Sequence, residues 1–267
     1  MNNSDILKQC FSFMDLTTLH PEDTAQSVKD LVEKANEIPA RFPSVPLPAS
    51  VCVFPNFAAT VRSARVSPEL HVTAVSGCFP ASQSYLEVKV LESVLAVRGG
   101  ADEIDIVLPL NSFLASDCQA ASSEIRRIRE AIVQEAAALG RPVVLKVILE
   151  TGVLGSDALI EKASLLAMEA GADFIKTSTG KVSVNATPGA ARVMCGAIRK
   201  YYEATGRMVG FKAAGGISTA DEAMEYYSIV SEILGPEWLD KKYFRFGVSR
   251  LGNSLLSGIT AETVKFF

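Results

Sequence analysis

Short apolar segments alternate with longer amphipathic segments along almost the whole chain, and this alternation constrains the fold more than any other feature. Each apolar segment has the length of a strand, and each amphipathic segment could cross over between parallel strands. The expected strands are 12–19, Ser50–Phe54, His71–Ser76, Glu103–Val107, Val143–Leu149, Phe174–Lys176, Met208–Lys212 and Phe244–Gly247. The expected helices are 1–10, 21–38, Ser84–Ala96, Glu124–Leu139, Ser156–Ala170, Pro188–Tyr202 and Thr219–Leu234.

Eight strands that alternate with helical segments predict an α/β protein with a single (β/α)8 TIM barrel and a short N-terminal helix. The length of 267 residues suits one such barrel, so we expect residues 1–267 to form one domain. An open doubly wound sheet is the alternative. Its dinucleotide-binding version carries a G-x-G-x-x-G fingerprint after an early strand, which this sequence lacks.

The charge composition indicates which kinds of molecule the protein could bind. The chain has 26 Lys+Arg against 30 Asp+Glu, which argues against a nucleic-acid surface and favours small molecules. No apolar run approaches the roughly 18 residues of a membrane span. The start of the chain does not resemble a signal peptide, and Cys10, Cys52, Cys78, Cys118 and Cys195 show no disulfide or zinc spacing. We therefore expect a cytoplasmic protein without metal or cofactor.

Charged residues occur within or at the ends of otherwise apolar strands: Asp15, Asp105, Lys146, Lys176 and Lys212. In a parallel barrel the active site forms at the carboxyl ends of the strands. Five charged residues converging there are hard to explain as solvation. We therefore interpret them as one candidate site.

Lys176 is the candidate nucleophile of this site. A buried ammonium tends to lose its proton, and a neutral amine can attack a carbonyl. Lys212 follows 36 positions later, on the expected next strand, so its charge should lower the pKa of Lys176. Two alternatives stay open: Lys176 could extend to solvent, and Lys212 could bind a phosphate.

Asp105 is a candidate proton shuttle or a salt-bridge partner for a buried lysine. The segment Gly100–Asp102 is repeated at Gly171–Asp173, 71 positions later, which suggests that Asp105 and Lys176 lie at comparable depth. Glu103, at the expected start of a strand, is interpreted as structural.

Several glycine-rich segments could bind phosphate. Gly215 and Gly216 precede Ser218 and Asp221, whose spacing resembles a capping box and predicts free backbone N–H groups at a helix start. A similar Gly247–Arg250 segment follows the eighth strand, where barrels often bind phosphate. The expected binding residues are Gly180, Lys181, Gly215, Gly216, Gly247 and Ser249.

Asp15, Thr17 and Thr18 could support this site, but they could equally cap a helix that begins at Pro21. Lys146 is another candidate supporting residue. His20 and His71 are too few for a metal site, and no special role is assigned to them.

The sequence resembles the deoxyribose-phosphate aldolases, a family of class I aldolases, over nearly its whole length. The matching motifs are D-L-T-T-L at 15–19, V-S-G-C-F-P near 76–80, G-A-D-E-I-D-I-V-L-P at 100–109, L-K-V-I-L-E-T-G at 145–152, F-I-K-T-S-T-G at 174–180, G-F-K-A-A-G-G-I at 210–217 and F-R-F-G at 244–247.

The resemblance implies reversible cleavage of 2-deoxy-D-ribose 5-phosphate to D-glyceraldehyde 3-phosphate and acetaldehyde, without metal. It implies that Lys176 forms the Schiff base, Lys212 relays protons and Asp105 donates or accepts them. These substrates would be the partners, with no nucleic acid or membrane involved; a homodimer is left open.

Three positions depart from the family pattern. Ala213 replaces a proline, Arg250 replaces a second serine found in some relatives, and Phe266–Phe267 stands where some members end in a tyrosine. Two other functions also remain open: a phosphosugar-binding barrel without catalysis, and a Schiff-base aldolase for a related sugar or keto acid.

Overall fold

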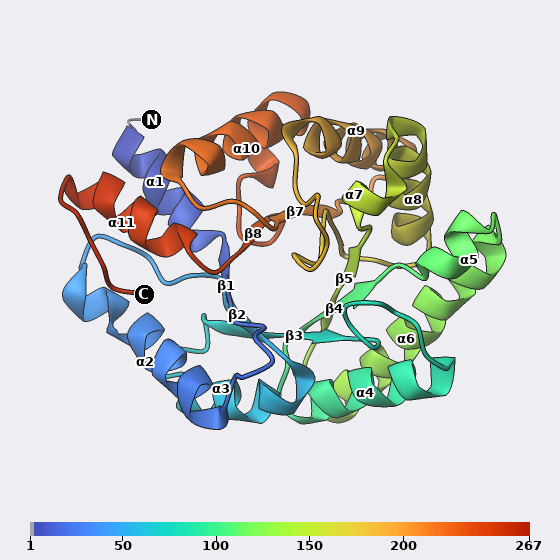
Figure 1. Cartoon of the computed structure of the whole chain (residues 1–267), viewed down its shortest axis with the longest axis horizontal. Helices are drawn as coiled ribbons and strands as arrows, with labels where there is room; N and C mark the ends of the chain where they lie inside the picture. Colours follow the sequence, from blue (N-terminus) through green and yellow to red (C-terminus); the bar gives the residue numbers. More distant parts are fainter. Residues whose placement is uncertain (1–2) are drawn as a thin grey trace.

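Eight parallel strands form a closed barrel in the computed structural model, which describes residues 3–267. Each strand pairs with its neighbours in sequence, and the last pairs with the first (Figure 1). The strands are β1 Met14–Thr17, β2 Ser50–Val53, β3 His71–Ser76, β4 Glu103–Val107, β5 Val144–Ile148, β6 Phe174–Lys176, β7 Gly210–Ala214 and β8 Phe244–Val248. The predicted (β/α)8 fold is confirmed.

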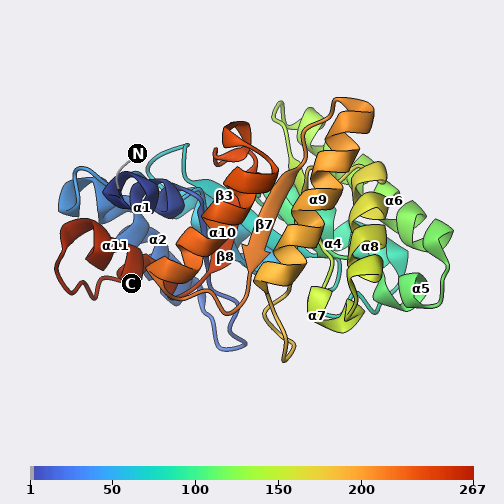
Figure 2. The same ribbon diagram turned by 90° about the horizontal axis from the view of Figure 1, so that it is seen from above.

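Helices surround the barrel in both views (Figures 1 and 2). They are α1 Asn3–Ser12, α2 Ala25–Arg41, α3 Ala58–Ala64, α4 Leu86–Arg98, α5 Leu110–Leu114, α6 Cys118–Ala138, α7 Thr151–Leu154, α8 Asp157–Glu169, α9 Pro188–Thr205, α10 Ala220–Ile233 and α11 Leu251–Thr260. Within residues 3–267, none of these helices has both the length and the apolar character that a membrane span requires.

All eight expected strands are present, whereas several helix boundaries differ from the prediction. The helix expected at Pro21 begins at Ala25, because Thr24 caps it and forms a capping box with Ser27. Asp117 caps α6, which therefore begins six residues earlier than the predicted Glu124. The prediction also missed α3, α5, α7 and α11; the first three have at most seven residues, too few to establish a helical period.

The two faces of the strands have different chemistry. Side chains such as Val51, Ile104 and Leu145 belong to the large apolar core of the molecule. Alternate residues point to the opposite face of a strand, and there Asp105 and Lys146 are completely buried. Barrel interiors are usually filled by branched apolar residues, so a charged interior indicates a specialised centre.

The repeated Gly-Ala-Asp segment performs the same structural task twice. Asp102 accepts a hydrogen bond from the backbone N–H of Val72 (3.0 Å), and Asp173 accepts one from that of Leu145 (2.9 Å). Each carboxylate thus joins its own strand to the preceding one. Asp105 aligns with Lys146 and, through it, with Phe174, and Lys176 lies two residues further along the same strand. Because tilted barrel strands are staggered, this offset over two strands agrees with the predicted comparable depth of Asp105 and Lys176, whose side chains are 3.0 Å apart.

Gly210 provides a test of packing inside the barrel. A methyl group at this position would lie closer than van der Waals contact to the ring of Phe174. We expect Gly210→Ala to lower the free energy of unfolding by about 1–3 kcal/mol, the usual effect of overpacking.

The matched control is Gly196→Ala in α9, where an added methyl group meets no atom of the described chain within 4 Å. It should stabilise the protein by about 0.5–1 kcal/mol through helix propensity. Urea denaturation of both variants measures the difference. Equal stability of the two variants would contradict this account of Gly210.

Candidate active site

Three lysines surround one carboxylate inside the barrel. Asp105 Oδ1 lies 2.9 Å from Lys146 Nζ, while Asp105 Oδ2 lies 3.0 Å from Lys176 Nζ and 2.8 Å from Lys212 Nζ. All four side chains are buried, and Lys176, at the carboxyl end of β6, is the most exposed of them at 3%. Lys176 and Lys212 are also aligned residues of adjacent strands. The alternative that Lys176 extends into bulk solvent is therefore wrong.

A second group of charges lies alongside this one. Glu103 contacts Lys146 (2.5 Å) and Arg245 (2.8 Å), and Arg245 also contacts Asp15 (2.6 Å). Asp15 in turn pairs with Lys212. Asp15 therefore belongs to the buried cluster and does not cap a helix. Glu103 and Arg245 were not predicted as members of the cluster.

The buried cluster contains one more basic group than acidic groups. Among lysine, arginine and carboxylate side chains of the described residues, its members are Asp15, Glu103, Asp105, Lys146, Lys176, Lys212 and Arg245. Three carboxylates face four bases, and an unbalanced buried charge is unfavourable. Loss of one proton from a lysine would balance the charges.

Lys176 is the lysine from which proton loss is easiest. Burial, and then the neighbouring charge of Lys212, lower the pKa of Lys176 below its ordinary value. Burial also disfavours the charged form of Lys212, but the carboxylates of Asp105 and Asp15 outweigh it and raise the pKa of Lys212. One lysine is thus poised to be a neutral amine beside a lysine that stays charged.

Asp105 remains ionised for the converse reason. Burial alone would raise its pKa, but Lys146, Lys212 and Lys176 together hold the pKa of this carboxyl well below its usual range. An ionised carboxylate accepts hydrogen bonds and protons but has no proton to donate. In this arrangement Asp105 orients the lysines, and the charged Lys212 is the group that carries a proton.

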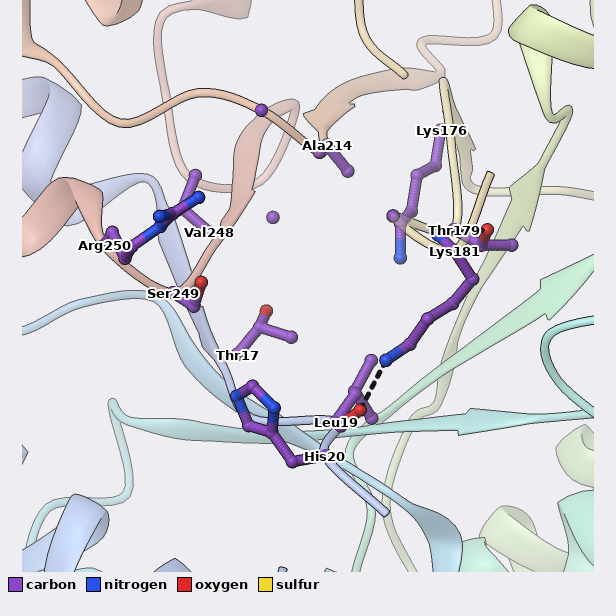
Figure 3. A pocket seen from close by; sticks show the side chains of 14 residues that line it. Thr17, Leu19, His20, Lys176, Thr179, Lys181, Ala214, Val248, Ser249 and Arg250 are labelled. Atoms are coloured by element: carbon purple, nitrogen blue, oxygen red, sulfur yellow. Dashed lines mark hydrogen bonds between the residues drawn. The ribbon is translucent and has the colours of Figure 1, made fainter. Parts of the chain in front are cut away.

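A cavity of about 220 Å³ opens at the carboxyl ends of β1, β6, β7 and β8, with Lys176 in its wall (Figure 3). All six residues expected to bind phosphate line this cavity: Gly180, Lys181, Gly215, Gly216, Gly247 and Ser249. His20 and Arg250 line it as well, whereas no carboxylate of the described residues does. The lining therefore suits an anion.

The backbone of the loop after β7 differs in one respect from the prediction. Gly215 and Gly216 both have φ of +86°, which favours glycine and allows the backbone to approach a ligand closely. However, Ser218 and Thr219 donate their N–H groups to the Glu222 carboxylate, at 2.8 and 2.9 Å. The predicted free N–H groups are therefore occupied, and the capping box joins Thr219 to Glu222 instead of Ser218 to Asp221.

Lys181 connects two loops across the cavity. Its Nζ donates a hydrogen bond to the carbonyl oxygen of Leu19, 2.6 Å away in the loop after β1 (Figure 3). Its backbone N–H donates to Thr179 Oγ1, and Thr179 donates to the buried carboxylate of Glu150. Glu150, which the prediction did not single out, therefore holds the loop after β6 in place. The sequence feature that could have identified Glu150 is its position directly after the expected strand Val143–Leu149.

Thr17 and Thr18 have different surroundings. Thr17 lines the cavity and donates its hydroxyl to the backbone carbonyl of Asp15 (2.8 Å). Thr18 donates its hydroxyl to Asp23 (2.8 Å). Within the described chain, Thr18 is therefore engaged in the loop before α2, and it does not line the cavity.

An apolar cluster adjoins the charged centre. Leu19, Cys52 and Val75 pack together with Phe54 and Phe79, and Leu19 also lines the cavity. Burial raises the pKa of the Cys52 thiol, and the nearby charges of Lys212 and Lys176 oppose this rise. The site thus combines a cationic opening, an amine and an apolar wall. This combination suits a phosphorylated carbonyl compound whose reacting end is apolar.

Comparisons with known proteins agree with this chemistry. A family model described as "DeoC/LacD family aldolase" matches residues 10–250. A Caenorhabditis elegans protein named "Putative deoxyribose-phosphate aldolase" is 43% identical over 262 residues, which cover 97% of this chain and 83% of that protein. A crystal structure of a Toxoplasma gondii protein of the same name is 25% identical, with a TM-score of 0.78 and coverage of 97% of this chain and 95% of that chain.

The fold is also that of deoxyribose phosphate aldolase from Aeropyrum pernix, described as tetrameric. That structure has a TM-score of 0.72 at 24% identity, covering 98% of this chain and 100% of that chain.

The charge of Lys212 should control the proton affinity of Lys176. We expect Lys212→Met to raise the pKa of Lys176, because the variant removes a like charge and leaves Asp105 with fewer cations. The midpoint of Lys176 labelling by a small amine-reactive reagent, followed by mass spectrometry, should move to higher pH by at least one unit.

Lys200→Met is the control, because Lys200 is an exposed surface lysine paired with Glu161. It should leave the midpoint unchanged. Circular dichroism checks that both variants are folded. A midpoint that stays in place or falls in Lys212→Met would refute the proposed coupling.

Proposed function

The chain belongs to the DeoC/LacD family of aldolases and is a carbon–carbon lyase, and on that premise we propose that it acts on 2-deoxy-D-ribose 5-phosphate. The products are D-glyceraldehyde 3-phosphate and acetaldehyde, and the reaction is reversible. The observation that carries this proposal is the excess of one base in the buried cluster, which favours a neutral Lys176. The pathway would be the breakdown of deoxyribose phosphate derived from deoxynucleosides.

The reaction begins with attack of the neutral Lys176 amine on the C1 aldehyde. Loss of water gives an iminium ion, which withdraws electrons from the adjacent bonds. A base removes the proton of the C3 hydroxyl, the bond between C2 and C3 breaks, and its electron pair forms an enamine on C1 and C2. Protonation of C2 and hydrolysis then release acetaldehyde and free Lys176.

Lys212 and Asp105 handle the protons in this proposal. Lys212 is held protonated and Asp105 is held ionised, and their contact of 2.8 Å joins them in one relay. Asp105 accepts the hydroxyl proton through a water molecule, and Lys212 supplies the proton that reaches C2. Asp15, Glu103 and Arg245 keep this pair in place.

The cationic opening holds the phosphate. Gly215 and Gly216 allow close approach of backbone, Ser249 offers a hydroxyl, and Lys181 offers its ammonium after leaving Leu19. Arg250 has no hydrogen-bond or ion-pair partner among residues 3–267, so its guanidinium is available to the same phosphate, where some relatives have serine. No cofactor is invoked.

The remaining parts of the proposal concern the whole chain. We propose that residues 1–267 act as one domain, and that the protein is cytoplasmic, where its five free cysteines would stay reduced. Its partners would be the phosphosugar and acetaldehyde, and a homodimer is the proposed assembly.

Lys176→Leu should abolish cleavage while preserving the fold. Removing this lysine leaves three bases facing three carboxylates, so the free energy of unfolding should not fall. Mass spectrometry after acetaldehyde and borohydride treatment should find a reduced two-carbon adduct on Lys176 of the wild type and none on the variant.

Lys181→Leu serves as the control, because it lies at the cavity but outside the buried cluster. It should weaken substrate binding and keep the adduct. Normal cleavage by Lys176→Leu, or a wild-type adduct located on another lysine, would disprove the assignment. An unlabelled wild type would favour a binding protein without catalysis.

The apolar wall should discriminate against a hydroxyl at C2. We expect kcat/KM for ribose 5-phosphate to be about 10²-fold lower than for deoxyribose 5-phosphate, because Leu19, which lines the cavity and packs on Cys52 and Val75, offers that hydroxyl no hydrogen-bond partner. Steady-state kinetics of both sugars measures the ratio.

Val75→Thr has nearly the same shape and adds a hydroxyl, so it should narrow the difference between the two sugars. Val133→Thr, on the exposed surface of α6, is the control and should leave the ratio unchanged. Equal use of the two sugars by the wild type would favour an aldolase for a related sugar.

A further inference from the structure

The loop after β3 has a strained backbone. Cys78 and Ser82 have φ of +59° and +54°, a left-handed conformation that is unfavourable for residues with a side chain. The N–H of Ser82 donates a hydrogen bond to the carbonyl oxygen of Cys78 (3.0 Å), so Cys78–Ser82 forms a closed turn. Such a conformation persists only where neighbouring groups hold it in place.

Helix α4 holds both ends of this turn. At one end, the Glu92 carboxylate accepts a hydrogen bond from the backbone N–H of Cys78 (2.7 Å). At the other end, Lys89 Nζ donates a hydrogen bond to Ser82 Oγ (3.1 Å). Lys89 is only 2% exposed and pairs with Glu124 of α6 (2.6 Å), so its ammonium is itself fixed. Neither Glu92 nor Lys89 lines the active-site cavity, so both act on the site from a distance.

The turn supports the apolar wall of the active site. Phe79 lies within the turn and packs on the cluster of Leu19, Cys52 and Val75. Its ring meets the ring of Phe54 edge to face, with centroids 6.4 Å apart. Leu19 in turn lines the cavity (Figure 3). The two anchors on α4 are therefore connected to the cavity through Phe79 and Leu19.

On the premise that the chain cleaves deoxyribose 5-phosphate, we propose that Glu92 and Lys89 are positioning residues that set the selectivity of the apolar wall against a hydroxyl at C2. With the turn anchored, Phe79 keeps the wall dry, and a C2 hydroxyl finds no hydrogen-bond partner there. Without an anchor, the left-handed residues relax, Phe79 withdraws and water enters beside Leu19. This water gives the hydroxyl a partner, and selectivity falls.

The first test measures the anchors without using the reaction. Cys52 is completely buried in the cluster on which Phe79 packs. Glu92→Ala should increase the rate of Cys52 alkylation by iodoacetamide about tenfold, because the wall opens locally. Mass spectrometry of peptides measures the rate at each cysteine. Cys10 and Cys195, which are completely buried outside this cluster, should stay unreactive, because the rest of the fold is unchanged.

Two variants at carboxylates of α4 serve as controls. Glu87→Ala removes an exposed carboxylate and should leave the alkylation rate of Cys52 unchanged. Glu92→Gln keeps an oxygen that can accept the N–H of Cys78, so it should restore most of the protection of Cys52. Lys89→Met removes the other anchor and should expose Cys52 as Glu92→Ala does. It takes the place of Glu92→Ala should that variant fail to fold.

The second test measures selectivity between the two sugars. In Glu92→Ala, the ratio of kcat/KM for deoxyribose 5-phosphate to that for ribose 5-phosphate should fall from about 10² to about 10. Phe79→Ala should cause the same fall. Adding Glu92→Ala to Phe79→Ala should change the ratio no further, because both substitutions act through the same ring. Glu87→Ala should keep the wild-type ratio.

Four results would overturn the proposal. Cys52 could stay protected in both Glu92→Ala and Lys89→Met, or the ratio could stay unchanged although Cys52 reacts. The effects of Glu92→Ala and Phe79→Ala on the ratio could add. Alkylation of Cys10 in both anchor variants would show that the anchors support the whole fold and not the wall. A wild type that cleaves neither sugar would instead contradict the proposed function, and the alkylation rates would still test the anchors.

Discussion

The buried cluster of three carboxylates and four bases is the interaction on which the rest of the site depends. Charges in a barrel interior are tolerated only when each has partners, and here each carboxylate contacts at least two bases. The cluster nevertheless contains one more base than it has carboxylates. Because Lys176 lies at the outer edge and Asp105 is its only carboxylate partner among the described residues, the imbalance falls on that amine. The same contacts that allow the barrel to bury charge therefore also lower the pKa of Lys176, as its proposed role as nucleophile requires.

The parallel barrel makes this arrangement geometrically simple. Aligned residues of adjacent strands point the same way, so Lys176 and Lys212 are neighbours without any special loop. The loops after the same strands form the cavity, which separates two tasks: the rigid interior sets proton affinity, whereas the loops supply hydroxyls, glycines and cations for a ligand. Glu150 and Lys181 connect the two levels, since both hold the loop that follows Lys176.

Much of the architecture could be predicted from the sequence, and the exceptions have physical causes. Strand periodicity located all eight strands and, with them, Asp105, Lys176 and Lys212. Arg245 was not assigned to the cluster, although it lies between Phe244 and Phe246 of an expected strand and so carried the same signal as Asp105. Its pairing with Glu103, 142 residues away, is a contact that no local pattern shows. Glu222 and Asp221 are both acidic residues near the start of α10, so only the observed helix start decides that Glu222 takes the N–H groups of Ser218 and Thr219. The bridge from Lys181 to Leu19 is likewise a contact between distant loops.

The interior cluster pairs its charges, whereas the lining of the cavity carries cations without carboxylates. Inside, bases and carboxylates are nearly balanced and fully buried, so small differences in contacts move one pKa without exposing charge to water. At the opening, Lys181 and Arg250 face no carboxylate of the described lining, and Lys181 is held only by a neutral carbonyl. A phosphate that entered would replace a hydrogen bond to a dipole by one to an anion, which is stronger. At the proposed phosphate site, Lys181 would thus exchange its hydrogen bond to Leu19 for one to a ligand, whereas in the interior only the protonation of Lys176 would change.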